Sequence, residues 1–168
     1  MEKTESIYGA HKPVIEQKLK DILAHVEEIR KTMEATLGMD PVEHCLGRVK
    51  SEESMREKCR RNNLPETTES ALEKLYDAIG VRIVCAFVDD VYTIRDFVVN
   101  SGRYEVLKEK DYIRRCKPNG YRSYHMILRV DGNTTPRSSF ALYQWIHGRR
   151  WSTILNIKRT LAADRRLL

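Results

Sequence analysis

Basic side chains recur beside hydroxyl groups in the segment "GRVKSEESMREK", where they could bind phosphate. Arg48 and Lys50 stand on an extended stretch, and Ser54 and Lys58 lie four residues apart on one face of the helix that follows. Ammonium and guanidinium groups make strong, charge-assisted hydrogen bonds to phosphate oxygens. A run of charges usually just faces water, however, so this segment by itself favours a solvated basic helix.

Two further candidates flank the start of an apolar strand in "LYDAIGVRI". Asp77 lies where a helix gives way to the strand. A carboxylate there can hold Mg²⁺ against phosphates, or it can simply cap a turn. Arg82 follows on the strand itself, where a guanidinium group is costly unless it reaches a partner or a ligand. Both a ligand-binding and a structural role remain open for this pair.

The segment "KPNGYRSYH" combines an aromatic ring with positive charge at the mouth of a strand. Tyr121 can stack on a base, and nearby basic side chains can meet phosphates; these are Lys110, Lys117, Arg122 and His125. The alternative is an amphipathic edge strand that binds nothing. Packing alone would not need exposed Tyr, Arg and His at this place.

The spacing of apolar and turn residues predicts the elements that would position these groups. One stripe at alternating spacings of four and three predicts a long N-terminal helix: Ile15, Leu19, Ile22, Val26, Ile29 and Met33. Ser51 is expected to cap the basic helix, a third helix is expected at about 67–76, and Asp89 or Asp90 is expected to cap a fourth. Strands are predicted in "GVRIVCAF", in "RYEVLKEKDYI" and from Tyr121 onward. These elements predict an α+β fold, a small mixed sheet with flanking helices.

Composition limits the class of protein and of partner. The chain has 168 residues, enough for one domain with its own core, and 30 Lys and Arg against 24 Asp and Glu give a net charge of +6. This balance favours phosphate-bearing partners such as nucleotides, nucleic acid or an anionic surface. The four cysteines lie far apart without a C-x-x-C pair, which suits reduced thiols and argues against a zinc site. No signal peptide or long apolar run is present, so we expect a cytoplasmic protein that does not enter membranes.

Four segments of the sequence, taken together, form a pattern that is specific to one protein family. In order and spacing, "GRVKSEESMREK", "YDAIGVRIVCAFVDDVYTI", "EKDYI" and "KPNGYRSYH" closely resemble the synthetase domain of the RelA/SpoT family, and especially its small stand-alone alarmone synthetases. The resemblance covers roughly residues 13–130. It implies a nucleotidyltransferase-like fold and a GTP pyrophosphokinase, which uses Mg²⁺ and transfers the β,γ-pyrophosphate of ATP to the 3′-hydroxyl of GDP or GTP.

The resemblance also implies roles for individual residues. Asp77 would be the catalytic residue and the Mg²⁺ ligand. The ATP-binding residues would be Arg48 and Arg82 on the adenine and Lys50, Ser54, Lys58 and Arg61 on the phosphates. Tyr121 would stack on the guanine of GDP or GTP, and Lys110, Lys117, Arg122 and His125 would line the same acceptor side.

The family pattern stops after Asp131. A glutamate expected next, as the partner of Asp77 around Mg²⁺, is absent. Back-translation of the segment that begins at Pro136, read two bases later, permits a sequence that opens E-I-Q-L-R-T and continues in the family pattern for about twenty codons. We therefore expect an N-terminal helical region at 1–38, an incomplete synthetase core at 39–135, and an out-of-frame tail at 136–168 that is poorly ordered or loosely collapsed. The alternative is a real, divergent tail that packs on the sheet.

Two functions follow from these observations. The first is a GTP pyrophosphokinase that makes the alarmone (p)ppGpp, with the activity of this chain weakened by the missing glutamate. The second is a catalytically impaired nucleotide- or RNA-binding remnant of the family. ATP and GDP or GTP are the expected partners, with RNA or an alarmone as a regulator. The resemblance implies a homotetramer, but an out-of-frame tail would remove the later helices through which small synthetases of the family assemble.

Overall fold

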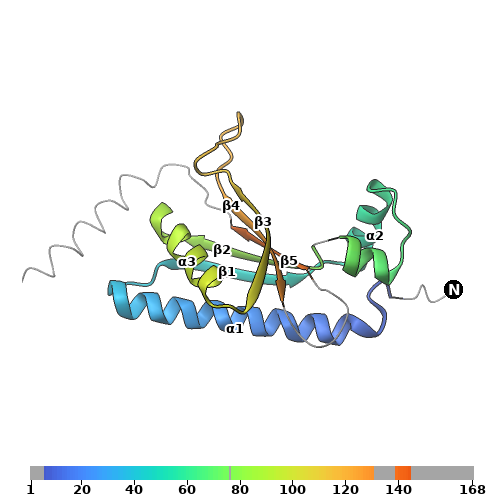
Figure 1. The fold of residues 1–168 in the computed structure, drawn as a ribbon, viewed down its shortest axis with the longest axis horizontal. Helices are drawn as coiled ribbons and strands as arrows, with labels where there is room; N and C mark the ends of the chain where they lie inside the picture. The colour runs from blue at the N-terminus through green and yellow to red at the C-terminus, as the bar shows by residue number, and fades with distance from the viewer. Residues whose placement is uncertain (1–5, 76, 131–138, 145–168) are drawn as a thin grey trace, which may run out of the picture.

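The computed structural model describes residues 6–75, 77–130 and 139–144 and contains one five-stranded sheet with helices packed on it (Figure 1). Its strands run in the order β1-β2-β5-β4-β3, with β2 and β5 parallel and the other neighbours antiparallel. This arrangement confirms the predicted α+β class with a small mixed sheet. The elements are η1 (Gly9–His11), α1 (Lys12–Leu37), β1 (Val42–Val49), α2 (Glu52–Arg61), η2 (Ser70–Lys74), β2 (Ile79–Cys85), α3 (Val88–Asn100), β3 (Tyr104–Asp111), β4 (Tyr124–Val130) and β5 (Ser139–Gln144).

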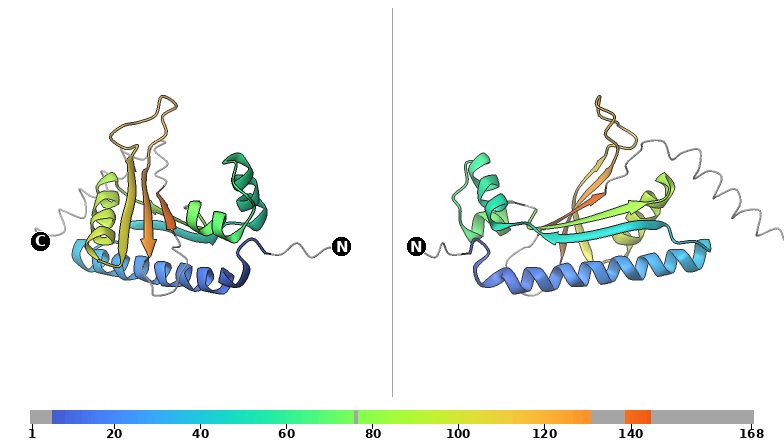
Figure 2. Two further views of the ribbon diagram at one scale, coloured as in Figure 1. Left: turned by 45° about the vertical axis from the view of Figure 1, so that its right-hand side comes forward. Right: turned by 180° about the vertical axis from the view of Figure 1, so that it is seen from behind.

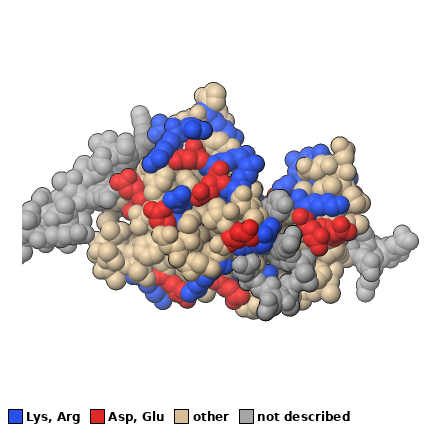
Figure 3. All heavy atoms as spheres, in the orientation of Figure 1, with Lys and Arg blue, Asp and Glu red and all other residues tan. Residues whose placement is uncertain are grey.

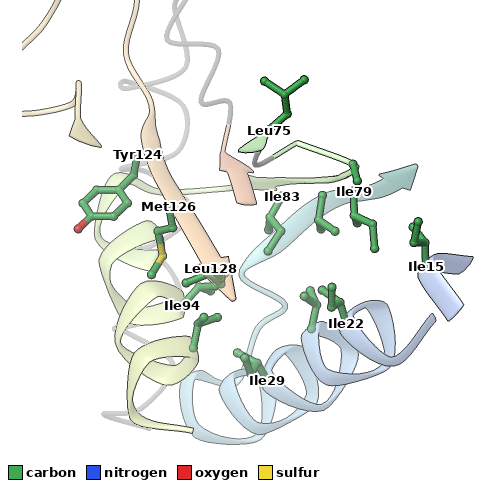
Figure 4. Close-up of a cluster of buried hydrophobic side chains, with 14 of the residues drawn as sticks. Ile15, Ile22, Ile29, Leu75, Ile79, Ile83, Ile94, Tyr124, Met126 and Leu128 are labelled. Carbon is green, nitrogen blue, oxygen red and sulfur yellow. The ribbon is translucent and has the colours of Figure 1, made fainter. Parts of the chain in front are cut away.

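The core lies between the sheet and the two helices α1 and α3. The predicted stripe of α1 is buried except at Leu19, which is partly buried against the core. Ile22 and Ile29 of α1 point toward Ile83 of β2, while Ile94 of α3 points toward Leu128 of β4 (Figure 4). Burying such side chains stabilises the fold by about 25 cal/mol for each Å² of apolar surface that is removed from water. This apolar layer therefore holds one face of the sheet against α1 and α3.

A glycine lets α1 approach the sheet closely. A Cβ atom on Gly47 of β1 would lie 2.6 Å from the side chain of Leu19 and 3.0 Å from that of Leu23. Gly47 therefore faces α1, and because strand side chains alternate, its neighbours Leu46 and Arg48 face the opposite side. Both α2 and the loop between β3 and β4 rise on that opposite side, away from α1 (Figures 1 and 2).

Two helix boundaries differ from the sequence-based expectation. The helix expected at about 67–76 is present from residue 68, with its last five residues in the π-helix η2, but it ends at Lys74, after which Leu75 adopts an extended backbone. The cap predicted for α3 at Asp89 or Asp90 is wrong, because Phe87 is the N-cap residue and makes no side-chain cap. Both aspartates lie inside the first turn, where their charge is favourable beside the positive end of the helix dipole. The Ser51 cap of α2 is confirmed, with its Oγ accepting from the Ser54 N–H.

Part of the segment beyond residue 135 forms a strand. Ser139–Gln144 is β5, which lies in the middle of the sheet between β2 and β4. These six residues of the expected out-of-frame tail therefore take part in the sheet. Residues 131–138 and 145–168 lie outside the described residues, and so do the tryptophans expected to pack on the sheet in the alternative interpretation. The reading frame and the domain boundaries stay predictions.

Candidate functional site

The outward face of β1 and β2 carries two arginines on either side of a glycine. Arg48 pairs in register with Gly80, and Leu46 pairs with Arg82. The two arginines are thus diagonal neighbours, and side chains in this relation stand about 7–8 Å apart. Gly80 leaves the space between them open, since a Cβ atom there would meet nothing within 4 Å. Two guanidinium planes at this spacing can hold one flat ring between them.

A cavity of about 490 Å³ opens at this place. It is lined by residues of β1, of β2 and of the segments that adjoin them, namely Leu46, Gly47, Arg48, Lys50, Asp77, Gly80, Val81 and Arg82. Four predicted site residues therefore share one cavity: Arg48, Lys50, Asp77 and Arg82. Strand pairing brings them together although Lys50 and Asp77 lie 27 residues apart in the sequence.

Asp77 holds two lysines at the edge of this cavity. Its Oδ2 atom accepts from Lys50 Nζ at 2.9 Å and from Lys58 Nζ at 2.5 Å. Burial works against ionisation of Asp77, but hydrogen bonds from Lys58 and Lys50 outweigh it, so the pKa of this carboxyl lies below its ordinary value. Asp77 is therefore a carboxylate, and the ammonium group of Lys50, which lines the cavity, is within reach of an anion bound there.

The other predicted phosphate ligands lie farther along α2. Ser54 is at the first turn, where its hydroxyl accepts from Ser51 Oγ at 2.9 Å. Arg61 is at the last turn and pairs with Glu57 at 3.8 Å. Neither residue lines the cavity. In the described part of the chain, the geometry joins Lys58 of α2 to the Asp77 centre but does not join Ser54 or Arg61 to it.

A second cluster forms where the loop between β3 and β4 meets the sheet. The hydroxyl of Tyr121 lies 2.8 Å from His125 Nε2, and the same nitrogen lies 2.6 Å from Ser123 Oγ. Tyr112 packs edge-on against both rings, with centroids 6.0 Å from Tyr121 and 5.2 Å from His125. Lys117 Nζ lies 5.3 Å from the Tyr121 ring centroid. These contacts confirm that Tyr121, His125 and Lys117 lie together.

The electrostatics of this second cluster favour a neutral imidazole. Burial lowers the pKa of His125, and the charges of Lys117 and Lys110 lower it further.

Arg122 is exposed just before β4. In the space-filling view, basic side chains gather over the projecting loop and over α2 (Figure 3). An anion that entered between these two elements would meet positive charge on both sides.

The strand register joins the two clusters. Arg82 of β2 and His125 of β4 pair with the same position of the intervening strand β5, and His125 in turn pairs with Lys110 of β3. Residues in one such row face the same side of a sheet, and two strand spacings amount to about 10 Å. The cavity with its arginines and the cluster around Tyr121 therefore open onto one face, side by side.

Two residues of this face were not among the sequence-based candidates. Leu46 lines the cavity and is 54% exposed, an unusual position for a leucine in a strand. Tyr112 completes the aromatic cluster. The signal for Leu46 was its alternation with Arg48, which puts both on one face of an extended stretch. The signal for Tyr112 was its place directly after Lys110 and Asp111, although only the folded loop reveals its contact with Tyr121.

Asp77 also fits a role in metal binding. Its second carboxylate oxygen, Oδ1, is buried and has no hydrogen-bond partner among the described residues. The described residues include no group of three or more His, Cys, Asp or Glu side chains that could hold a metal ion by themselves. Mg²⁺ at nucleotide sites commonly binds one or two carboxylates together with substrate phosphates, so a single carboxylate beside two lysines is a suitable partner.

Fold and site together define an α+β protein with a cavity suited to a flat ring and to phosphates. Residues 47–141 match the model of the region found in RelA/SpoT proteins. Since this match covers more than half of the chain, the protein belongs to the RelA/SpoT family. All the predicted site residues lie inside the matched region. No helix in the described ranges has both the length and the apolar character needed to cross a membrane.

Relatives and solved structures agree with this assignment. The chain is 40% identical over 103 residues to the GTP pyrophosphokinase YwaC of Bacillus subtilis, covering 61% of this chain and 49% of that protein. It is 33% identical over 112 residues to YjbM of the same organism, covering 67% and 52%. The chain thus spans about half the length of these curated relatives. Among structures, the small alarmone synthetase 1 from Bacillus subtilis bound to its product pppGpp superimposes with a TM-score of 0.69 at 27% identity, covering 89% of this chain and 76% of that one.

Proposed function

We propose that this protein is a GTP pyrophosphokinase, which transfers pyrophosphate from ATP to the 3′-hydroxyl of GDP or GTP and so makes the alarmone (p)ppGpp. The observation that supports the proposal is the common row of Arg82 and His125, because it puts the arginine-lined cavity and the cluster around Tyr121 on one face of the sheet. The names of the relatives, and the pppGpp bound by the synthetase from Bacillus subtilis, support the same activity.

ATP would occupy the cavity on β1 and β2. Its adenine would lie between Arg48 and Arg82, over Gly80, because guanidinium planes stack well on flat rings. Its phosphates would then reach Lys50 and Lys58, which the structure holds together at Asp77. Ser54 and Arg61 would join them only if α2 closed over the nucleotide, and this closure is part of the proposal.

GDP or GTP would bind at the cluster around Tyr121. Stacking of a base on an aromatic side chain is worth about 1–3 kcal/mol, and Tyr121 offers such a ring at the open face. Lys110, Lys117, Arg122 and His125 would face the phosphates of the acceptor. The lowered pKa of His125 means that it would act there as a neutral hydrogen-bonding group.

Mg²⁺ is the proposed cofactor, with Asp77 as its protein ligand. The ion would neutralise charge that develops on the transferred group. Lys50 and Lys58 would keep their contacts on the phosphates, and the buried Oδ1 atom of Asp77 would gain the partner that it lacks among the described residues. Asp77 is the catalytic residue in this proposal because it would hold the ion against the reacting phosphates.

The reading frame beyond residue 135 decides how active this chain can be. In the alternative frame a glutamate is encoded across the codons of Pro136 and Arg137, just ahead of the strand β5. Asp77 likewise lies just ahead of β2, and the two strands are parallel, so both carboxylates would precede their strands at the same end of the sheet. We therefore expect the alternative frame to supply the second carboxylate, and the present chain to turn over slowly.

The test compares two proteins in one assay. The 168-residue chain and a chain that continues in the alternative frame after residue 135 are each incubated with ATP, Mg²⁺ and GDP or GTP, and AMP and (p)ppGpp are measured. The reframed chain should form both products and should lose this activity on Asp77→Ala. Nucleotide binding without AMP release by either chain would favour the binding remnant instead. Equal turnover by the two chains would refute the role given to the missing glutamate.

A further inference from the structure

The segment that precedes α1 packs against the phosphate side of the cavity. Tyr8 is 1% exposed, and its hydroxyl donates to the backbone carbonyl of Lys50 at 2.7 Å. Around it, Ser6 Oγ donates to Glu52 Oε1 at 2.8 Å, and Lys12 Nζ lies 3.7 Å from the same oxygen. Residues 6–12 are thereby tied to the junction between β1 and α2, on which Lys50 lies.

Lys50 is held from three directions. Its N–H donates to the carbonyl of Ala78 at 2.8 Å, its own carbonyl accepts from Tyr8, and its ammonium group reaches Asp77 Oδ2 at 2.9 Å. Ala78 is the neighbour of Asp77 in the chain. The backbone contact on one side thus fixes Lys50 beside the carboxylate, and the Tyr8 contact on the other side fixes the peptide plane from which the chain turns into α2.

Packing alone does not account for the hydroxyl of Tyr8. A phenylalanine would fill the same buried space, whereas a buried hydroxyl is costly unless it makes a hydrogen bond. Burial and the nearby charges of Asp77 and Glu52 raise the pKa of Tyr8, so the hydroxyl stays protonated and remains a donor. The group that this donor serves is a backbone atom of Lys50.

We propose that Tyr8 is a positioning residue for ATP, which acts through Lys50. Its hydroxyl holds the Lys50 peptide so that the ammonium group stands between Asp77 and the phosphates of the bound nucleotide. This role rests on the proposed function, in which Lys50 binds those phosphates. Tyr8 itself lies outside residues 47–141, the region that matches the family model.

The experiment measures ATP and GDP binding by calorimetry, with Mg²⁺ present, for the full chain and for Tyr8→Phe, Lys50→Ala and the double variant. Loss of one hydrogen bond from a positioning group should weaken ATP binding about three- to tenfold in Tyr8→Phe. GDP binding should stay within about twofold of the parent, because Tyr8 has no contact with the cluster around Tyr121 in this scheme. In the Lys50→Ala background, Tyr8→Phe should have little further effect.

Tyr104→Phe is the matched control, since it also removes one tyrosine hydroxyl. That hydroxyl lies 2.8 Å from His25 Nδ1 of α1, on the face of the sheet opposite the cavity. This variant should leave ATP binding unchanged. Three results would overturn the role of Tyr8: ATP affinity equal to that of the parent, equal losses for ATP and GDP, or an undiminished loss when Lys50 is already alanine. A parent that binds GDP but no ATP would instead overturn the proposed function, and the role of Tyr8 with it.

Discussion

At the scale of single residues, the centre of the site is a carboxylate shared by two lysines. Asp77 is only 11% exposed in its side chain, and both ammonium groups contact the same oxygen. Each lysine is therefore partly neutralised before any nucleotide binds. In the proposed function a phosphate would compete with Asp77 for Lys50 and Lys58, and Mg²⁺ would compete with the lysines for Asp77. The two ligands should consequently bind more tightly together than either binds alone.

This competition predicts an unusual effect of Asp77→Asn. Without its charge the side chain no longer holds the two ammonium groups, so ATP measured in the presence of EDTA should bind more tightly than to the parent, by about threefold or more. The gain in ATP affinity that Mg²⁺ gives to the parent should disappear. Calorimetry with and without the metal measures both quantities.

Asp96→Asn serves as the control for this experiment. Asp96 pairs with Arg95 on α3 and is 55% exposed, outside the residues that line the cavity. Its removal should change neither quantity. Weaker metal-free binding of ATP to Asp77→Asn would show that the carboxylate orients the lysines for the phosphates and does not compete with them.

At the scale of elements, one polar contact crosses the interface between α1 and β3. His25 is 5% exposed on the buried face of α1, and its Nδ1 atom lies 2.8 Å from the hydroxyl of Tyr104 on β3. Burial lowers the pKa of His25, and the nearby Arg103 lowers it further against the opposing effect of Glu28. The imidazole is thus neutral where the two elements meet.

The lowered pKa predicts how stability depends on pH. Between the folded-state pKa and the ordinary value of about 6.5, the unfolded chain binds more protons than the folded one, so the free energy of unfolding rises with pH. Stability should therefore fall as the pH drops below about 6.5. Urea unfolding at pH 7.5 and pH 5.5 measures the difference, which should be smaller in His25→Gln.

A second histidine contributes to this pH dependence. His125 also has a lowered pKa and acts in the same direction, so part of the effect should remain in His25→Gln. An unchanged slope in His25→Gln would mean that protonation of His25 is tolerated at this interface.

At the scale of the whole molecule, β5 joins two halves of the sheet. It pairs with β2 on one side and with β4 on the other, so the β1–β2 pair and the β3–β4 pair have no direct strand contact with each other. The proposed ATP site lies on the first pair and the proposed acceptor site begins at the second. The distance between the two sites therefore depends on β5, the last of the described strands along the chain.

Truncation tests the role of this strand. A chain that ends at residue 135 lacks β5 and leaves two open strand edges, so it should lose cooperative thermal unfolding and tend to aggregate. A chain that ends at residue 144 retains β5 and should unfold cooperatively, as the 168-residue chain does. Circular dichroism and light scattering during heating distinguish the two. Cooperative unfolding of the shorter chain at the parent's midpoint would show that the halves hold together through α1 and α3 alone.

The sequence by itself determined the features that depend on local spacing. The stripe of α1, the Ser51 cap and the alternation along β2 and β4 were predictable, because helix and strand periods place neighbouring residues on faces without reference to the rest of the chain. The family and the candidate residues also came from short motifs in a fixed order. Asp77, Arg82 and Tyr121 were each found in this way.

Only the tertiary structure decided which of these residues meet. The sequence placed Arg82 and His125 on separate strands, but their common row depends on β5 entering between β2 and β4, and strand register is set by hydrogen bonds between distant segments. The end of the third helix at Lys74 and the contact of Tyr8 with Lys50 are decided in the same way. Local propensity carries no information about such partners, since each contact forms only after loop closure and packing have brought remote segments together.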